Sequence, residues 1–198
     1  MNRHTEYDTR EHLLATGEQL CLHRGFTGMG LSELLKTAGV PKGSFYHYFR
    51  SKEAFGACML DRHYACYLAT LRQHFTQGAG THRDRLLAWY EHNLTQFRHS
   101  GTLGNCLTVK LSAEVCDLSE DMRVALDRGA SQVIGLLAET IDQAVNDNSL
   151  AAVEDSHALA QVLYALWLGG NLQAKISRSA APLETTFRYI KTMLDVPA

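Results

Sequence analysis

The sequence predicts an all-α protein of about nine helices, with a helix-turn-helix domain at the N-terminus and a larger helical domain after it. Proline occurs only at Pro41, Pro182 and Pro197, so a long central part of the chain contains none. Apolar residues recur at spacings of three and four, which is the period of an amphipathic helix, and the alternation typical of strands is absent. Breaks between the expected helices coincide with clusters of Gly, Ser, Asn and Thr, at residues 76–82, 100–105, 146–149 and 179–182.

Composition narrows the class of protein further. The 198 residues are 45% apolar and 20% charged, as expected for a packed globular chain. The polar N-terminus lacks the apolar stretch of a secretory signal, and no window approaches the roughly 18 uninterrupted apolar residues of a membrane span. The five cysteines are an odd number without CxxC spacing, which favours reduced thiols over disulfides or structural zinc. We therefore expect a cytoplasmic protein without a membrane partner and without a cofactor.

Charge adds a weak signal. The formal net charge is −2, which by itself does not favour nucleic acid. Residues 1–52 hold seven Lys or Arg against five Asp or Glu, a balance of +2. Residues 53–198 hold twelve against sixteen, a balance of −4. The asymmetry has the direction expected of an N-terminal DNA-binding domain, but it is small.

The first three helices are closely spaced, and the second and third are short. The first is expected over about residues 9–24, because Gly25 stops it. The second has an apolar face with helical spacing and is ended by Gly39. The third begins at Pro41, which suits a first helical turn because its missing N–H would have no partner there. The apolar face of the second helix consists of Leu31, Leu34, Leu35 and Ala38.

The remaining six helices are longer. Ser51 is expected to cap a helix that runs to about Gln77. Ser119, followed by Glu120 and Asp121, gives the seventh helix both a cap and acidic residues at the positive end of its dipole. The seventh helix is expected over about 119–147, and the other helices over about 83–99, 105–117, 154–178 and 183–195.

The stretch GVPKGSFYHYFRSKEAF, residues 39–55, places four aromatic residues within positions 45–49, beside several basic ones. At about 100° per residue, Phe45, Tyr48 and Phe49 share one arc of the third helix, which predicts that they face the core. Tyr46 and His47 face the opposite way with Gly43, and Lys42 and Ser44 flank them. The simplest interpretation is an ordinary amphipathic helix.

Two features favour a DNA-reading surface instead. Gly43 costs so short a helix up to about 1 kcal/mol, and it is useful where a partner must approach the backbone closely. The outward face offers hydrogen-bond donors and no carboxylate. Two short helices joined by a glycine turn form a helix-turn-helix, whose second helix lies in the major groove.

Residues 39–55, together with Arg24–Gly25–Phe26 and the frame from Leu31 to Val40, resemble the N-terminal signature of the tetracycline-repressor (TetR) family. The resemblance implies a homodimeric, all-helical transcriptional regulator, with a DNA-binding domain at residues 1–52 and a sensing and dimerisation domain at 53–198. It implies that the operator is contacted, mostly at phosphates, by Lys42, Ser44, Tyr46, His47 and Lys52, with Gly43 allowing close approach. One departure is Met29–Gly30, where the family usually has Thr or Ser as a cap beside a phosphate.

The C-terminal domain contains a helix, residues 159–178, that is apolar nearly all round and should be buried on two sides. Gly169 and Gly170 would let another helix pack close. With the final helix it is the candidate for a four-helix dimer interface, and the alternative is a buried helix of a monomer.

Cys106 stands apart from the other cysteines because it follows a break and opens a helix, with Asn105 as its expected cap. A helix N-terminus stabilises a thiolate, and a nearby loop gives access. The alternative is a buried small residue. Lys175 is unusual on its apolar helix; it either complements the helix C-terminus or lies near Cys106 and favours the thiolate. Cys58 and Cys66 share a helix face, and His63 with Cys66 could ligate a metal, but no second ligand pair is evident, so we expect no metal site.

Residues 105–122 and 165–179 resemble the subfamily of TetR repressors that control N-ethylmaleimide reductase and respond to electrophiles and oxidants through cysteine. The resemblance implies that Cys106 is the sensor and that the regulated genes encode detoxifying reductases. Pairing of Lys175 with Cys106 is our own hypothesis.

Three other interpretations remain at this stage. A TetR regulator could bind a lipophilic ligand non-covalently. A thiol-dependent enzyme could use Cys106, but no resolving CxxC, base or oxyanion donor is evident, so no catalytic residue is expected. A non-specific DNA-coating protein fits poorly with an acidic chain.

Overall fold

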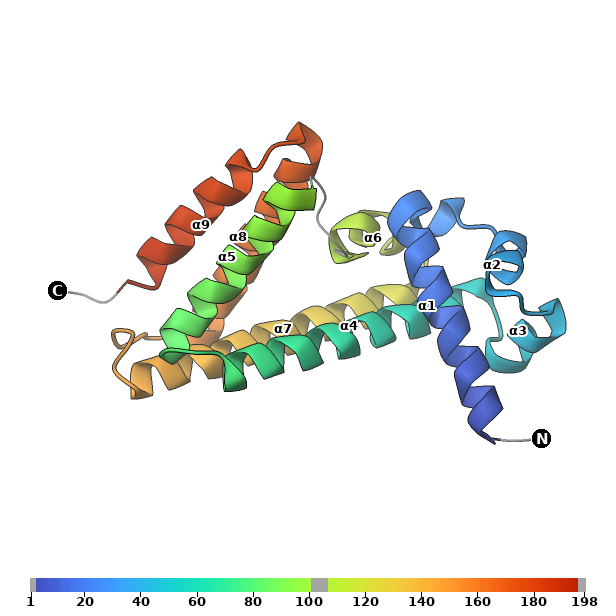
Figure 1. Cartoon of the computed structure of the whole chain (residues 1–198), viewed down its shortest axis with the longest axis horizontal. Coiled ribbons are helices and arrows are strands. Elements are labelled where there is room, and N and C mark those ends of the chain that lie inside the picture. Colours follow the sequence, from blue (N-terminus) through green and yellow to red (C-terminus); the bar gives the residue numbers. More distant parts are fainter. Residues whose placement is uncertain (1–2, 101–106, 196–198) are drawn as a thin grey trace. The chain divides into compact units, whose positions relative to one another are not determined.

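The computed structural model describes residues 3–100 and 107–195, and this part of the chain consists of helices joined by short loops (Figure 1). The described residues contain no strand, and none of their helices has the length and apolar character needed to cross a membrane. The helices are α1 (Arg3–Gly28), α2 (Leu31–Ala38), α3 (Lys42–Tyr48), α4 (Lys52–Gln77), α5 (His82–Ser100), α6 (Leu107–Val115), α7 (Glu120–Asn146), α8 (Ser156–Ser177) and α9 (Ala181–Met193).

The predicted fold class and the order of the helices are confirmed. Gly25 ends the regular part of α1, as expected, but one further helical turn follows it. The third helix begins at Lys42, because the extended ψ of 148° at Pro41 makes that residue the N-cap. The expected caps at Ser51 and Ser119 are present, with their hydroxyl oxygens accepting from the N–H groups of Ala54 and Met122. Asp155 caps α8 by accepting from the Ala158 N–H, so α8 starts two residues later than expected.

The chain divides into two compact units. The first contains residues 1–67 and 105–129, and the second contains residues 68–104 and 130–198. The boundaries fall inside α4 and α7, so each of these helices contributes to both units. The functional division at residue 52 is a different one and stays a prediction.

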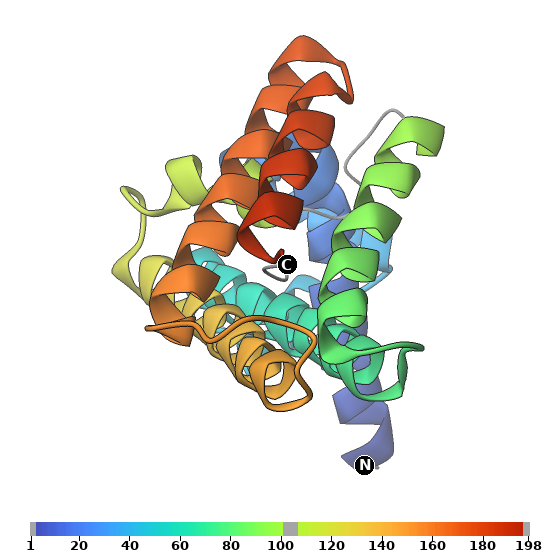
Figure 2. The same cartoon turned by 90° about the vertical axis from the view of Figure 1, so that its left-hand side faces the viewer.

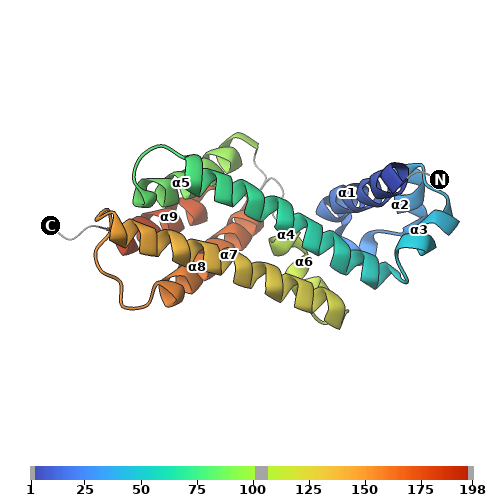
Figure 3. The same ribbon diagram turned by 90° about the horizontal axis from the view of Figure 1, so that it is seen from below.

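In the first unit, α1, α2 and α3 pack around the beginning of α4. Gly17 of α1 lies so close to the Phe55 ring of α4 that an added Cβ would stand 2.8 Å from Phe55 Cε1. The first halves of α4 and α7 run side by side in the same direction (Figures 1 and 3). Gly56 of α4 makes this possible, because a Cβ there would lie 2.7 Å from the Met122 side chain of α7.

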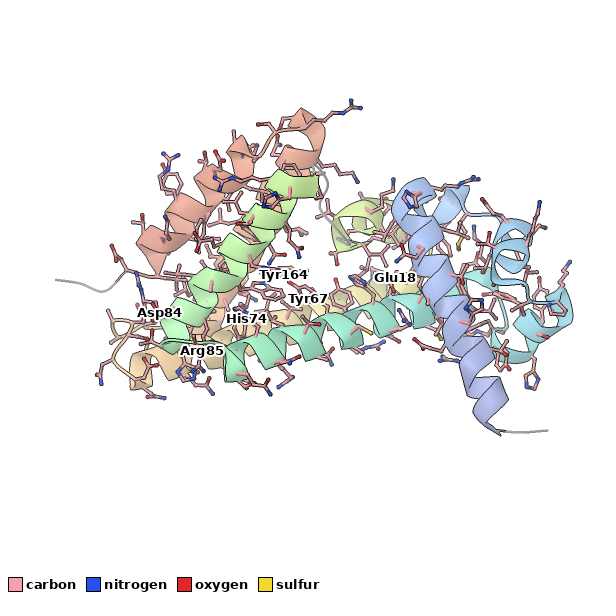
Figure 4. The ribbon with its side chains drawn as sticks, in the orientation of Figure 1. Glu18, Tyr67, His74, Asp84, Arg85 and Tyr164 are labelled. Carbon is pink, nitrogen blue, oxygen red and sulfur yellow. The ribbon has the colours of Figure 1, made fainter. Side chains whose placement is uncertain are left out.

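A charged cluster fastens α1 to α4 in the first unit. Glu18, which lies on α1 (Figure 4), accepts hydrogen bonds at 2.7 Å from Arg62 and pairs at 2.8 Å with His63. Arg62 also pairs with Glu11. Burial raises the pKa of Glu18, but its contacts with His63 and Arg62 outweigh burial and lower it. The Glu18 carboxylate is therefore charged at neutral pH, and His63 is engaged with it.

In the second unit, α8 and α9 lie side by side, with α5 alongside (Figure 2). Gly170 allows the close approach of α9, because a Cβ there would lie 2.6 Å from Thr186 Oγ1. The Tyr90 and Trp167 rings meet edge to face at 5.0 Å and join α5 to α8. At the turn between α4 and α5, where Figure 4 labels His74 and Arg85, the His74 ring lies 2.9 Å from the Arg85 carbonyl oxygen.

Candidate nucleic-acid interface

The turn between α2 and α3 has the geometry of a helix-turn-helix. Gly39 adopts a left-handed conformation, φ 64° and ψ 28°, which favours glycine. Its N–H donates to the Lys36 carbonyl at 3.3 Å, and the Val40 N–H donates to the Leu35 carbonyl at 3.0 Å. These bonds satisfy the last carbonyls of α2 and turn the chain directly into α3.

Aromatic packing fixes α3 on the first unit. Phe45 and Phe49 are buried, and their ring centroids lie 5.5 and 5.0 Å from that of Phe55 at the start of α4. The Arg10 guanidinium lies over the Phe49 ring at 5.5 Å. Tyr48 is only partly buried. The expected core face of the helix is therefore present, with Tyr48 at its edge.

The opposite face of α3 is open to solvent. Lys42, Gly43 and His47 are exposed, Tyr46 is 52% exposed, and Ser44 is partly exposed. No acidic residue lies in the first turn of α3. A Cβ added to Gly43 would meet nothing within 4 Å, so packing inside the chain does not require glycine there. The structure brings these five residues together on one donor-rich surface.

Lys52 has a different position from the other predicted contacts. Its Nζ donates to the Phe26 carbonyl at 2.8 Å and lies 4.6 Å from the centroid of the Phe26 ring. The ammonium has three donors, so the Phe26 carbonyl uses one of them. Lys52 thus ties the beginning of α4 to the end of α1, and its predicted contact with DNA would have to use the remaining donors.

The beginning of α2 lacks a side-chain cap. Gly30 is the N-cap, with φ −77° and ψ 141°, and it makes no side-chain hydrogen bond. Glu33, which could have completed a capping box, pairs instead with Arg24 at 2.9 Å. The backbone N–H groups at this end are left to solvent or to a partner.

A contact between α6 and the end of α1 was not predicted from the sequence. Glu114, near the end of α6, accepts hydrogen bonds from the backbone N–H groups of Phe26 and Thr27 and from the Thr27 hydroxyl. At the adjacent Gly25, φ is 76° and ψ is 173°, and a Cβ would lie 2.7 Å from the Glu114 carboxylate. Glycine is therefore required there both by its torsion angles and by the carboxylate beside it.

The Glu114 carboxylate is ionised at neutral pH. Burial raises its pKa, but hydrogen bonds from Thr27 and Phe26, together with the charge of Lys110, outweigh burial and hold the pKa below its ordinary value. A carboxyl group whose pKa is lowered by folding contributes stability above its unfolded pKa, and that stability disappears as the pH falls through the folded value. The interaction is consequently at full strength at physiological pH.

Cys106 and Lys175 are the two predicted sensor residues. Cys106 lies outside the described residues, and Lys175 is exposed in the last turn of α8. Cys21 is fully buried, and burial raises the pKa of its thiol to about 12, which makes it unreactive. Cys66 is exposed, while Cys58 and Cys116 are partly buried. In the described part of the chain, no three His, Cys, Asp or Glu residues are grouped as a metal site would require.

Comparison with known families accounts for both parts of the chain. Residues 13–55 match the bacterial regulatory proteins of the tetR family, and residues 82–190 match the tetracyclin repressor-like C-terminal domain. The first match includes the open face of α3, and the second includes α5 to α8 and most of α9.

Individual relatives extend over the full length. The chain is 63% identical to the HTH-type transcriptional repressor NemR of Escherichia coli K12 over 198 residues, all of both proteins. It is 31% identical to the transcriptional regulator AcuR of Cereibacter sphaeroides, covering 90% of this chain and 81% of that protein. Among solved structures, the reduced form of E. coli NemR superposes with a TM-score of 0.91 at 62% identity, covering 96% of this chain and 99% of that one.

The helix-turn-helix geometry, the donor-rich face of α3 and these relatives lead to one conclusion. A protein of this kind binds operator DNA as a homodimer and is not an enzyme. The chain belongs to the TetR family of bacterial regulatory proteins and is a DNA-binding transcriptional repressor.

Proposed function

We propose that this repressor holds its operator through α3 and is released when an electrophile or oxidant reacts with Cys106, so that detoxification genes are expressed. The observation that carries the DNA-binding half is the exposed, carboxylate-free face of α3 over a buried aromatic anchor. The proposed release by an electrophile or oxidant is supported by the chain's 63% identity to E. coli NemR, a repressor whose structure was solved in a reduced form.

On the DNA side, Lys42, Ser44, Tyr46 and His47 contact phosphates and base edges in the major groove, and Lys52 adds a phosphate contact. Gly43 lets the duplex backbone approach α3. In a dimer the two α3 helices must stand about 34–36 Å apart to enter successive major grooves. Any change that alters this spacing lowers affinity for the operator. The DNA-binding domain is proposed to comprise residues 1–52, and the sensing domain residues 53–198.

On the sensor side, the chemistry is an addition to a thiolate. The Cys106 sulfur attacks the alkene carbon of an acceptor such as N-ethylmaleimide, a C–S bond forms, and a proton is taken up at the neighbouring carbon. The position of Cys106, directly before α6, supports a lowered thiol pKa. Lys175 is proposed to lie near Cys106 and to favour its thiolate. Modification then displaces α6 and shifts the population toward a state that does not fit the operator.

The dimer interface is proposed to be the outer face of α8 with α9. On α8 the face runs through Val162, Ala165, Gly169, Leu172 and Ile176, at three- and four-residue spacings, and all of these residues are exposed in the single chain. Ile176 is 67% exposed and Tyr189 of α9 is 60% exposed. Nothing lies within 4 Å of a Cβ added at Gly169, which leaves room for a partner helix to approach. Because a repressor must reach bacterial DNA, we propose that the protein resides in the cytoplasm.

Gly43→Ala tests the contact with DNA at Gly43 without disturbing the fold. Alanine improves helix propensity by up to about 1 kcal/mol and meets no neighbour, so the thermal midpoint should stay equal or rise. The operator dissociation constant, measured by fluorescence anisotropy, should rise roughly tenfold, equivalent to about 1.4 kcal/mol. An unchanged dissociation constant would contradict close approach of DNA at Gly43.

Leu172→Glu tests the dimer face. An unpaired charge buried in an interface costs about 3 kcal/mol, so the dimer dissociation constant in sedimentation equilibrium should rise roughly a hundredfold. Leu118→Glu is the matched control, because Leu118 is 48% exposed and Leu172 is 45% exposed. Equal behaviour of the two variants would place the interface elsewhere.

The proposed sensing function is tested by an operator gel shift with wild type, Cys106→Ser and Cys66→Ser. N-ethylmaleimide should release wild type and Cys66→Ser and leave Cys106→Ser bound. A reversible oxidant should release the same two proteins, and added reductant should restore their binding. Release of Cys106→Ser by N-ethylmaleimide would favour non-covalent sensing of a lipophilic ligand or a different cysteine.

A further inference from the structure

Glu114 connects the helix that follows Cys106 to the junction between α1 and α2. We infer that the carboxylate of Glu114, bound to the backbone of Phe26 and Thr27, is the positioning element that couples α6 to the operator-reading helices; we call it the Glu114 latch. The inference rests on the proposed function, since it assigns a route by which reaction at Cys106 reaches the DNA-binding domain.

The latch exists because α1 is broken. In a continuous helix the N–H groups of Phe26 and Thr27 would donate to carbonyls four residues earlier. The torsion angles of Gly25 interrupt that ladder, and both N–H groups donate to Glu114 instead. Glu114 thus acts as an N-cap supplied by a different helix, 88 residues away in sequence from Phe26.

The break is held from two sides. The Glu114 carboxylate accepts hydrogen bonds from the N–H groups of Phe26 and Thr27, and Lys52 Nζ donates to the Phe26 carbonyl at 2.8 Å. The Phe26 side chain is only 1% exposed and packs against Gly56, where an added Cβ would lie 2.7 Å from the ring. The Phe26 side chain is therefore held by packing. The position of its backbone depends on Glu114 and Lys52, which bind its N–H and carbonyl groups.

The end of the break leads directly to the DNA surface. Thr27 is followed within four residues by Leu31, the first residue of α2, and Met29 between them is buried. The Arg24–Glu33 ion pair at 2.9 Å joins the residue before the break in α1 to α2. The left-handed Gly39 then joins α2 to α3. A shift of the backbone at Phe26 and Thr27 thus moves the start of α2, and with it the position of α3 relative to the DNA.

Helix α6 transmits displacement from its beginning to Glu114. It spans Leu107–Val115, and Leu107, Leu111 and Val115 are buried on one face. Glu114 lies seven residues after Leu107, about 10 Å along the helix axis. Protein N–H···O hydrogen bonds have donor–acceptor distances of about 2.7–3.2 Å, and a contact at about 3.6 Å is no longer one, so a shift of α6 by about 1 Å breaks the latch.

Glu114→Gln tests the latch, with Glu120→Gln as the matched control. The amide retains the shape of the side chain but loses the charge and turns one acceptor into a donor. Glu120 is an exposed carboxylate that pairs at 2.8 Å with Arg123 of its own helix, α7. Operator dissociation constants are measured by fluorescence anisotropy, before and after N-ethylmaleimide, for wild type and both variants.

Before modification, Glu114→Gln should bind the operator at least tenfold more weakly than wild type. After modification its affinity should change less than twofold, because the connection that modification breaks is already gone. Glu120→Gln should keep both the affinity and the release of wild type. Adding Thr27→Val, which removes only the hydroxyl, should weaken the wild type but add little to Glu114→Gln.

Three results would overturn the inference. Wild-type affinity in Glu114→Gln would show that the latch does not position the DNA-binding helices. Weaker binding with an undiminished release ratio would reduce Glu114 to a structural contact without a role in coupling. Failure of wild type itself to be released would overturn the proposed function, and the role of the latch in release with it.

Discussion

The break in α1 at Gly25 is the constraint on which the arrangement of the DNA-binding helices depends. It leaves backbone donors at Phe26 and Thr27 that a continuous helix would have satisfied, and a carboxylate from α6 accepts them. Because a buried or partly buried donor without a partner is costly, the end of α1 and the end of α6 must stay together. The start of α2 lies only a few residues beyond, so the same contact determines where the helix-turn-helix begins.

This arrangement gives the two faces of α3 separate tasks. Phe45 and Phe49 attach the helix to Phe55 of α4, where ring contacts tolerate little displacement. Tyr46 and His47 are exposed on the face of α3 that is predicted to contact the operator. Lys52 shows how closely the tasks are connected, because a lysine predicted to contact DNA also holds the Phe26 carbonyl. If Lys52 also contacts the operator as predicted, DNA binding and the attachment of α1 to α4 share this residue.

Local patterns in the sequence predicted the helices and the orientation of α3, because the spacing of Phe45 and Phe49, the glycine at residue 39 and the serine caps act within a few residues. The sequence did not predict the Glu114 contact, since the partners are 88 residues apart and Glu114 sits in an ordinary helical pattern. From the sequence, Gly25 was expected only to stop the first helix, and nothing local indicates which side chain fills the space beside it. The inward hydrogen bond of Lys52 escaped prediction for the same reason. The predicted roles of the α3 residues, Cys106 and Lys175 stay predictions.

The most direct test of the account is hydrogen exchange at the Phe26 and Thr27 amides, followed by NMR before and after modification with N-ethylmaleimide. If the Glu114 latch opens on modification, both amides should exchange slowly in the unmodified repressor and at least roughly tenfold faster after modification, as expected when a local hydrogen bond opens. The amide of Leu14, a fully packed residue of α1, should keep its rate. Unchanged exchange at Phe26 and Thr27 in a modified protein that no longer binds the operator would contradict the account.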